Sequence, residues 1–185
     1  MAYTTIYPTL DIYHVSATSM RNPDYFSGIF KSYYPHYAFD PTKSLTGPSA
    51  NNCWISLQRQ YIKQRIWANL NSPHIITKLY YENYHDGHIV CDFNPAIYTN
   101  DQYDGAYQGS IWGSHAQPEA YGNYQRSTLL WEGNFEKHSN FNSSDPKYII
   151  FSNTTSYQYY YIDIANNYSG NFGIGFRRLA WQENI

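Results

Sequence analysis

The stretch YQYYYIDIA at residues 157–165 decides the fold class of this chain. Successive side chains of an extended strand point to opposite faces, so every second residue of the stretch shares a face. One face takes Tyr160, Ile162 and Ile164, and the other takes Tyr159, Tyr161 and Asp163. We therefore expect a half-buried strand, with the isoleucine face on a core and the opposite face toward solvent.

Short segments of the same kind recur along the chain, divided by Pro, Gly, Asn and Asp. The clearest further strands are expected at residues 75–81, 108–113, 128–132, 147–151 and 173–182. Residues 56–70 are ambiguous, because Ile62 and Ile66 fit a helical spacing while Ile66, Ala68 and Leu70 alternate as in a strand. We favour a loop followed by a strand from about Arg65. Many short strands between turn residues indicate an all-β domain.

The composition agrees with strands and excludes several classes of partner. The chain has 22 tyrosines, and aromatic residues (19%) outnumber charged ones (14%). Tyrosine suits pleated, half-buried strands and recognition surfaces. A net charge of −2 gives no basic surface for nucleic acid. Because the sequence has neither a long apolar run nor a signal-peptide pattern at its start, we expect no membrane insertion and synthesis in the cytoplasm.

Several segments, taken in order, resemble the discoidin-like domain family, also called coagulation factor 5/8 type C or galactose-binding-like domains. The segments are AFDP at residues 38–41, NNCWIS at 51–56, IWANL at 66–70, IITKLYYEN at 75–83, GSIWGS at 109–114, residues 157–164, and GFRRL at 175–179. The resemblance covers about residues 36–182. Two of its motifs, YYENYH at residues 80–85 and GFRR at 175–178, are most similar to discoidin-like domains of phage virion and tail-associated proteins.

The resemblance implies a two-sheet antiparallel jelly-roll sandwich over residues 36–185, with residues 1–35 as an N-terminal arm or edge extension. It places Trp54 in the core between the sheets. Trp67 falls on the outward phase of its strand, so packing and stacking on a sugar both stay open for it. The sequence departs from the family in its long insertion at residues 84–108, in NLN at 69–71 replacing Asp-Leu-Gly, and in the arginines at 177 and 178 where an acidic residue is common.

Function in such a sandwich is expected in the loops at its end. The candidate loops are residues 43–51, 84–107 and 117–125. Their aromatic residues offer rigid rings with polar tips, which suit neutral glycans or a protein partner. The candidate ligand-binding residues are Tyr84, His85, Tyr98, Tyr103, Tyr107, Tyr121 and Tyr124.

Metal sites and catalysis have little support in the sequence. The family's calcium-binding turn would place a structural Ca²⁺ near Asp40, largely through backbone carbonyls, although Pro41 replaces the usual glycine. His85, His88 and Cys91, followed by Asp92, have spacings that could converge on a transition metal. The stretch opens as a turn, however, and no second Cys or His pair completes a site, so we expect turn and surface residues there. Asp101 and Asp104 are typical of a solvated turn. Cys53 and Cys91 are expected to be reduced packing residues. No hydrolase or phosphate-binding motif occurs, so we expect no enzyme and no other cofactor.

Two functions therefore remain for a non-catalytic protein of a phage virion. The first is recognition of cell-surface carbohydrate, with weak binding multiplied by many copies. The second is a capsid or tail decoration subunit whose aromatic faces bind neighbouring virion proteins. An uncharged, aromatic surface and an N-terminal arm favour a homo-oligomer in either case.

Overall fold

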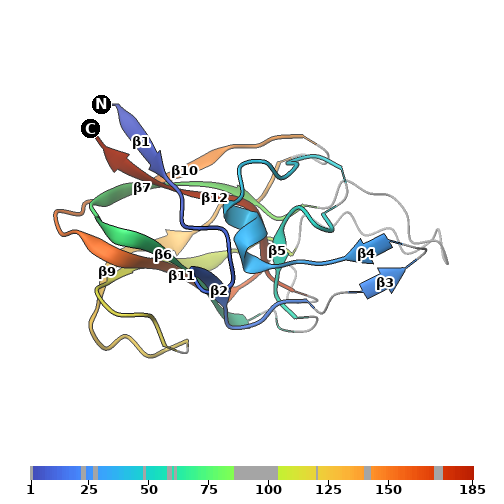
Figure 1. Cartoon of the computed structure of the whole chain (residues 1–185), viewed down its shortest axis with the longest axis horizontal. Helices are drawn as coiled ribbons and strands as arrows, with labels where there is room; N and C mark the ends of the chain where they lie inside the picture. The colour runs from blue at the N-terminus through green and yellow to red at the C-terminus, as the bar shows by residue number, and fades with distance from the viewer. Residues whose placement is uncertain are drawn as a thin grey trace.

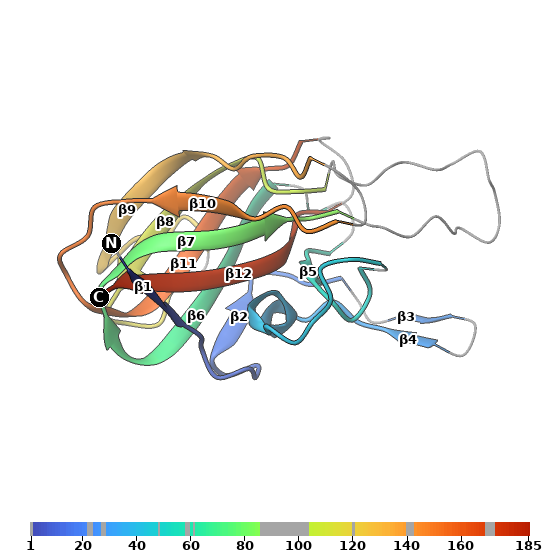
Figure 2. The ribbon, with the colours of Figure 1, turned by 90° about the horizontal axis from the view of Figure 1, so that it is seen from above.

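A computed structural model describes residues 2–21, 24–26, 29–47, 49–57, 60, 62–85, 104–119, 121–139, 143–168 and 173–185. These residues form a sandwich of two antiparallel sheets (Figures 1 and 2). The prediction of an all-β jelly roll with two opposed sheets is thus confirmed. Within the described residues, no helix is long and apolar enough to cross a membrane.

The first sheet, sheet A, has the strand order β1-β12-β7-β10, and β5 also pairs with β12. Its strands are β1 (Tyr3–Ile6), β5 (Trp54–Ile55), β7 (Ile76–Asn83), β10 (Lys147–Ile150) and β12 (Gly175–Asn184). The second sheet, sheet B, has the order β2-β6-β11-β8-β9. Its strands are β2 (Val15–Ala17), β6 (Ile62–His74), β8 (Gln108–Ser114), β9 (Ser127–Asn134) and β11 (Tyr157–Asn166). The remaining elements are a hairpin of β3 (Asp24–Phe26) with β4 (Ile29–Lys31) and the 3-10 helix η1 (Pro35–Phe39).

Every strand expected from alternation is present, with ends that differ by at most two residues. The ambiguous segment is a strand, as favoured, but β6 begins at Ile62 rather than near Arg65 and continues to His74. It extends this far because β11 pairs with it from Tyr157↔His74 to Asn166↔Ile62. Long-range pairing of this kind overrides the local helical spacing.

The core lies between the two sheets and is rich in large rings. Trp54 is fully buried, with its ring centroid 6.4 Å from that of Phe176, so its predicted packing role is confirmed. Tyr160 extends from β11 toward sheet A, and its hydroxyl donates to the carbonyl of His74 at 2.6 Å. Rings that bury their area and also satisfy their polar atoms fix one arrangement of the sheets.

One part of the strand prediction is wrong. The isoleucine face of β11 is buried as expected, but Tyr161 and Asp163 on the opposite face are also buried, at 0% and 1% exposure. The connection between β8 and β9 crosses this outer face and covers it. Alternation identified the two faces correctly but could not show that both would be covered.

The first 35 residues contribute strands to both sheets. β1 pairs with β12 at the edge of sheet A, and β2 pairs with β6 at the edge of sheet B. The indole N–H of Trp54 donates to the carbonyl of Ser19 at 3.0 Å, which ties this segment to the core. The domain boundary at residue 36 stays a prediction.

Candidate functional site

The outer face of sheet B carries two rows of side chains that run across neighbouring strands. One row is aromatic and apolar: Trp67, Tyr161, Trp112 and Leu129 on β6, β11, β8 and β9. The next row is polar: Arg65, Asp163, Ser110 and Glu132 on the same four strands. Both rows follow from strand register, because directly paired residues point to the same side of a sheet.

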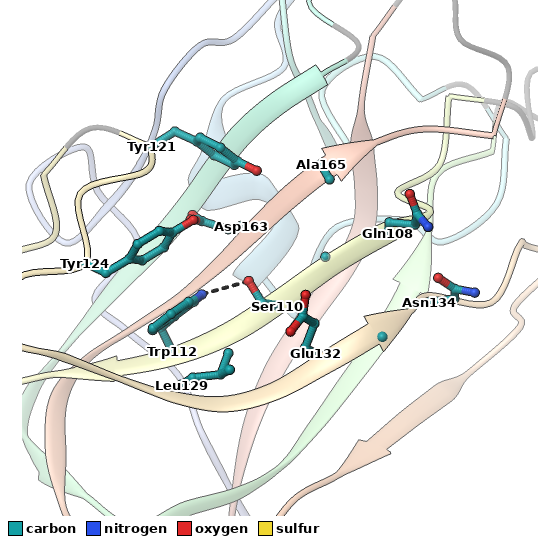
Figure 3. Close-up of a pocket in the computed structure, with 12 residues that line it drawn as sticks. Gln108, Ser110, Trp112, Tyr121, Tyr124, Leu129, Glu132, Asn134, Asp163 and Ala165 are labelled. Atoms are coloured by element: carbon teal, nitrogen blue, oxygen red, sulfur yellow. Dashed lines mark hydrogen bonds between the residues drawn. The ribbon is translucent and has the colours of Figure 1, made fainter.

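A groove of about 440 Å³ opens over this face (Figure 3). A volume of this size lies within the range of small-molecule binding sites. The residues that line it are Gln108, Gly109, Ser110, Trp112, Tyr121, Tyr124, Leu129, Glu132, Gly133, Asn134, Asp163 and Ala165. In Figure 3 the rings of Trp112, Tyr121 and Tyr124 gather at one end, Gln108 and Asn134 lie at the other, and Glu132 lies between them beside Ser110.

The aromatic end is built around Trp112. The ring of Tyr124 stacks on the indole with centroids 4.2 Å apart and planes within 19°. The indole N–H donates to the hydroxyl of Ser110 at 2.7 Å, which fixes the orientation of the ring. Tyr124 is 37% exposed, so the stack presents a flat, preformed surface to solvent. Such a surface matches the apolar face of a sugar ring.

A buried ion pair lies beneath the aromatic end. The guanidinium of Arg65 donates to both carboxylate oxygens of Asp163, from Nε at 2.5 Å and from Nη2 at 2.8 Å. Burial alone would lower the pKa of Arg65, but the hydrogen bond and charge of Asp163 raise it instead. Nη1 donates to the backbone carbonyl of Glu119 at 2.7 Å. Arg65 therefore holds the covering segment against the sheet.

The same ion pair acts on the tyrosines of the covering segment. The Arg65 guanidinium carbon lies 5.7 Å from the ring centroid of Tyr124 and 4.3 Å from that of Tyr161. Burial, followed by the nearby charge of Asp163, raises the pKa of Tyr124 to about 12. Its hydroxyl is protonated near neutral pH, as for an ordinary tyrosine.

The comparisons with known proteins bear on the fold. No protein-family model and no curated protein matches the sequence. One similar solved structure is the family 32 carbohydrate-binding module of NanJ from Clostridium perfringens, in complex with galactose. Its sequence is 15% identical to this chain. The match covers 98% of this chain and 100% of that chain, with a TM-score of 0.59. The chain has the discoidin-like jelly-roll fold.

Two further similar structures are binding modules. CpGH89CBM32-5 of Clostridium perfringens, in complex with GalNAc-beta-1,3-galactose, is 14% identical, covers 92% of this chain and 94% of that chain, and has a TM-score of 0.59. A chitosan-binding module of a chitosanase/glucanase from Paenibacillus sp. IK-5 is 14% identical to this chain. The match covers 98% of this chain and 99% of that chain, with a TM-score of 0.57. At these identities the likeness concerns the discoidin-like fold alone.

The predicted ligand residues fall in different parts of this discoidin-like sandwich. Tyr121 and Tyr124 line the groove. Tyr107 lies outside it and contacts the ring of Tyr168, with centroids 4.7 Å apart and planes tilted by 38°. Tyr98 and Tyr103 lie outside the described residues, as do His88, Cys91, Asp92 and Asp101 of the weaker metal patterns.

Tyr84 and His85 are buried beyond the end of β7, at 2% and 0% exposure. The hydroxyls of Tyr84 and Ser49 are 3.1 Å apart. His85 Nε2 donates to the carbonyl of Leu45 at 3.0 Å, and burial, then the charge of Arg177, lowers the pKa of His85 to about 3. Both side chains therefore hold Leu45 and Ser49 in place, with His85 neutral.

The rest of the groove was missed by the sequence analysis. Trp112, Leu129 and Glu132 were read only as parts of strands, and no role was given to their outward faces. A usable signal existed, because Gln108, Ser110 and Trp112 alternate along their strand opposite Ile111. Trp67 is 9% exposed and packs edge-on against Tyr159, so the packing alternative holds for it.

The loop after Asp40 does not fit a calcium ion. Asp40 Oδ1 accepts from the backbone N–H and the hydroxyl of Thr42, at 2.9 and 2.7 Å. The carbonyl oxygens that follow accept from Arg178 (Lys43 O, 2.5 Å), His85 (Leu45 O, 3.0 Å) and Arg177 (Gly47 O, 2.7 Å). Calcium requires six to eight converging oxygens, whereas Asp40 Oδ1 and these three carbonyls already accept hydrogen bonds from the protein's own donors. No cluster of three or more metal-ligating side chains occurs among the described residues.

We therefore expect the midpoint temperature of unfolding not to depend on calcium. The unfolding midpoint in excess EGTA should equal that in millimolar CaCl₂, because the guanidinium groups already satisfy the carbonyls. Differential scanning calorimetry measures this. A bound ion at a hundred times its dissociation constant would add about 2.7 kcal/mol, so a rise of several degrees with calcium would contradict the assignment.

Proposed function

We propose that the chain is a non-catalytic glycan-binding module whose site is the groove on the outer face of sheet B. The observation that carries this proposal is the stacked pair of Trp112 and Tyr124, half open to solvent at one end of a groove of about 440 Å³. The carbohydrate-binding modules that share the fold support the ligand class.

The chemistry of the groove suits a sugar. A pyranose ring has an apolar face, which packs on an aromatic ring, and a rim of hydroxyls, which donate and accept hydrogen bonds. Glu132 in the middle of the groove and Asn134 at its polar end are exposed, and Gln108 offers an amide whose oxygen already accepts from Asn166 at 2.8 Å. Aromatic packing and side-chain hydrogen bonds are thus available within one groove.

The setting that we propose for this module is a phage virion, where many copies would multiply a weak single-site affinity. Its support is the sequence resemblance in residues 80–85 and 175–178. The second candidate function, a decoration or assembly subunit, is favoured by a separate observation. Leu10, Ile12 and Tyr13 on the N-terminal segment are exposed, Tyr13 by 79%, and such side chains suit contact with a neighbouring subunit.

We expect Tyr124→Ala to weaken glycan binding by about 30-fold, which corresponds to about 2 kcal/mol for losing a central aromatic contact. An array of neutral, acidic and amino oligosaccharides would identify the ligand, and isothermal titration calorimetry would measure the affinity. Tyr13→Ala is the matched control, because this exposed tyrosine makes no ring contact with described residues.

The two variants separate the candidate functions. Loss of binding in Tyr124→Ala alone supports the groove as a glycan site. Unchanged glycan affinity in Tyr124→Ala would rule the groove out. Loss of self-association in Tyr13→Ala, with no glycan bound by any form, would favour the assembly function instead.

A further inference from the structure

The charge of the groove is set by one carboxylate. Two acidic residues line it, Asp163 and Glu132, and none of its described lining residues is a lysine, arginine or histidine. Asp163 is buried and both of its oxygens are bound by Arg65, which neutralises it. Glu132 is exposed and makes no hydrogen bond or ion pair with any described residue. The groove therefore presents a single uncompensated negative charge to a ligand.

Glu132 also stands beside the surface on which a sugar ring would pack. It is paired across the strands with Ser110, while Trp112 lies two residues further along β8 on the same face. Figure 3 shows the Glu132 carboxylate beside Ser110, near the hydrogen bond between Ser110 and Trp112. A ligand ring that packs on the Trp112–Tyr124 stack would thus bring a substituent on its edge toward Glu132.

This arrangement discriminates between classes of glycan by charge. The carboxylate of a uronic or sialic acid would be repelled by Glu132 and would find no cation within the described groove. A neutral hydroxyl can donate to Glu132, but a protonated amine forms a charge-assisted hydrogen bond, which is about twice as strong. The ring face of Tyr124 that is not stacked on Trp112 can also attract a cation.

Resting on the proposed function, we infer that the groove selects amino sugars that carry a free, protonated amine. Glu132 accepts a hydrogen bond from the ammonium group, and the Trp112–Tyr124 stack packs against the sugar ring. N-acetylation removes the positive charge of the amine and adds bulk beside Glu132. Acidic glycans are excluded by the same carboxylate.

The test compares three tetrasaccharides by isothermal titration calorimetry at pH 6 and low salt: β-1,4-linked glucosamine, its fully N-acetylated form, and a uronic acid oligomer. We expect the glucosamine tetramer to bind about tenfold more tightly than the acetylated one, and the uronic acid oligomer not to bind. The advantage of the amine should shrink as salt is raised. In Glu132→Gln the ratio of the two affinities should fall to about one.

Glu136→Gln is the matched control, since the Glu136 side chain is 71% exposed and lies outside the groove. Equal binding of the amino and acetylated tetramers, with both lost in Tyr124→Ala, would overturn the amine selectivity and leave the glycan site standing. A preference for glucosamine that survives in Glu132→Gln would also overturn it. No binding of these tetramers or of any sugar on the array would overturn the proposed function itself.

Discussion

Asp163→Asn should lower the free energy of unfolding by about 3–5 kcal/mol, the usual cost of removing one partner from a buried ion pair. The cause is the Arg65 guanidinium, which is fully buried and would keep its charge while losing the anion that both Nε and Nη2 contact. Urea denaturation followed by circular dichroism measures the change. Glycan affinity should fall as well, because Arg65 also holds the segment that carries Tyr124.

The double variant Arg65→Met, Asp163→Leu provides the control for this prediction. Replacing both charges by apolar side chains leaves no unpaired ion, so most of the lost stability should return. Glycan binding should nevertheless stay weak, because the hydrogen bond from Arg65 to the carbonyl of Glu119 is absent. A loss below about 1 kcal/mol in Asp163→Asn, the value typical of an exposed pair, would show that the pair is solvated.

Acid should destabilise the protein through Glu82. This fully buried carboxylate on β7 accepts from the Tyr80 hydroxyl at 2.5 Å, the Ser144 hydroxyl at 2.9 Å and the Asp145 backbone N–H at 3.0 Å, and His138 Nε2 lies 3.9 Å away. Burial alone would raise the pKa of Glu82, but His138 and these hydrogen bonds outweigh burial and lower it to about 2.

The direction of the pH effect follows from this lowered pKa. Below the ordinary value of 4.5 the unfolded chain binds a proton at Glu82 that the folded chain does not, so folding weakens as pH falls. The contribution of Glu82 is fully present above pH 4.5 and is lost between about pH 4.5 and pH 2. Its size is about 2–4 kcal/mol.

Urea unfolding at pH 6, 4, 3 and 2.5 checks the acid effect. In Glu82→Gln the unfolding free energy should start lower at pH 6 and fall less steeply toward pH 2.5. A residual slope is expected, because hydrogen bonds within the structure also lower the pKa values of Asp40 and Asp145. Glu136→Gln should follow the wild type, and equal slopes for Glu82→Gln and wild type would refute the role of Glu82.

The fold was predictable where apolar and polar residues alternate along a short segment. The β11 segment shows its two faces in nine residues, and β8, β9 and β12 are bounded by turn residues that mark where pairing stops. Residues 62–74 were harder, because β6 is defined by pairing with β11, whose residues lie about a hundred positions away. Alternation carries no information about such a distant partner.

The candidate site was predictable only in part. Tyr121 and Tyr124 were expected in a functional loop, and they line the groove. Arg65 and Asp163 are 98 positions apart in the sequence, so no local motif contains both. Their ion pair nevertheless positions the segment that carries Tyr121 and Tyr124, because Arg65 also donates to the carbonyl of Glu119. Tyr84 and His85 were expected to face a ligand because they are ring-bearing residues of the candidate loop at residues 84–107. Hydrogen bonds with Ser49 and Leu45 of a separate loop hold them buried instead.

The most direct test of the glycan groove is chemical-shift mapping by NMR, with ¹⁵N-labelled protein titrated with the glucosamine tetramer. We predict that the shifted signals belong to the Trp112 indole N–H, to the backbone of Gln108–Ser114 and Ser127–Asn134, and to residues 121–126. Shifts confined to the loops at residues 40–47 and 49–57, with the Trp112 indole unmoved, would place the ligand at the end of the sandwich and contradict the groove as its site.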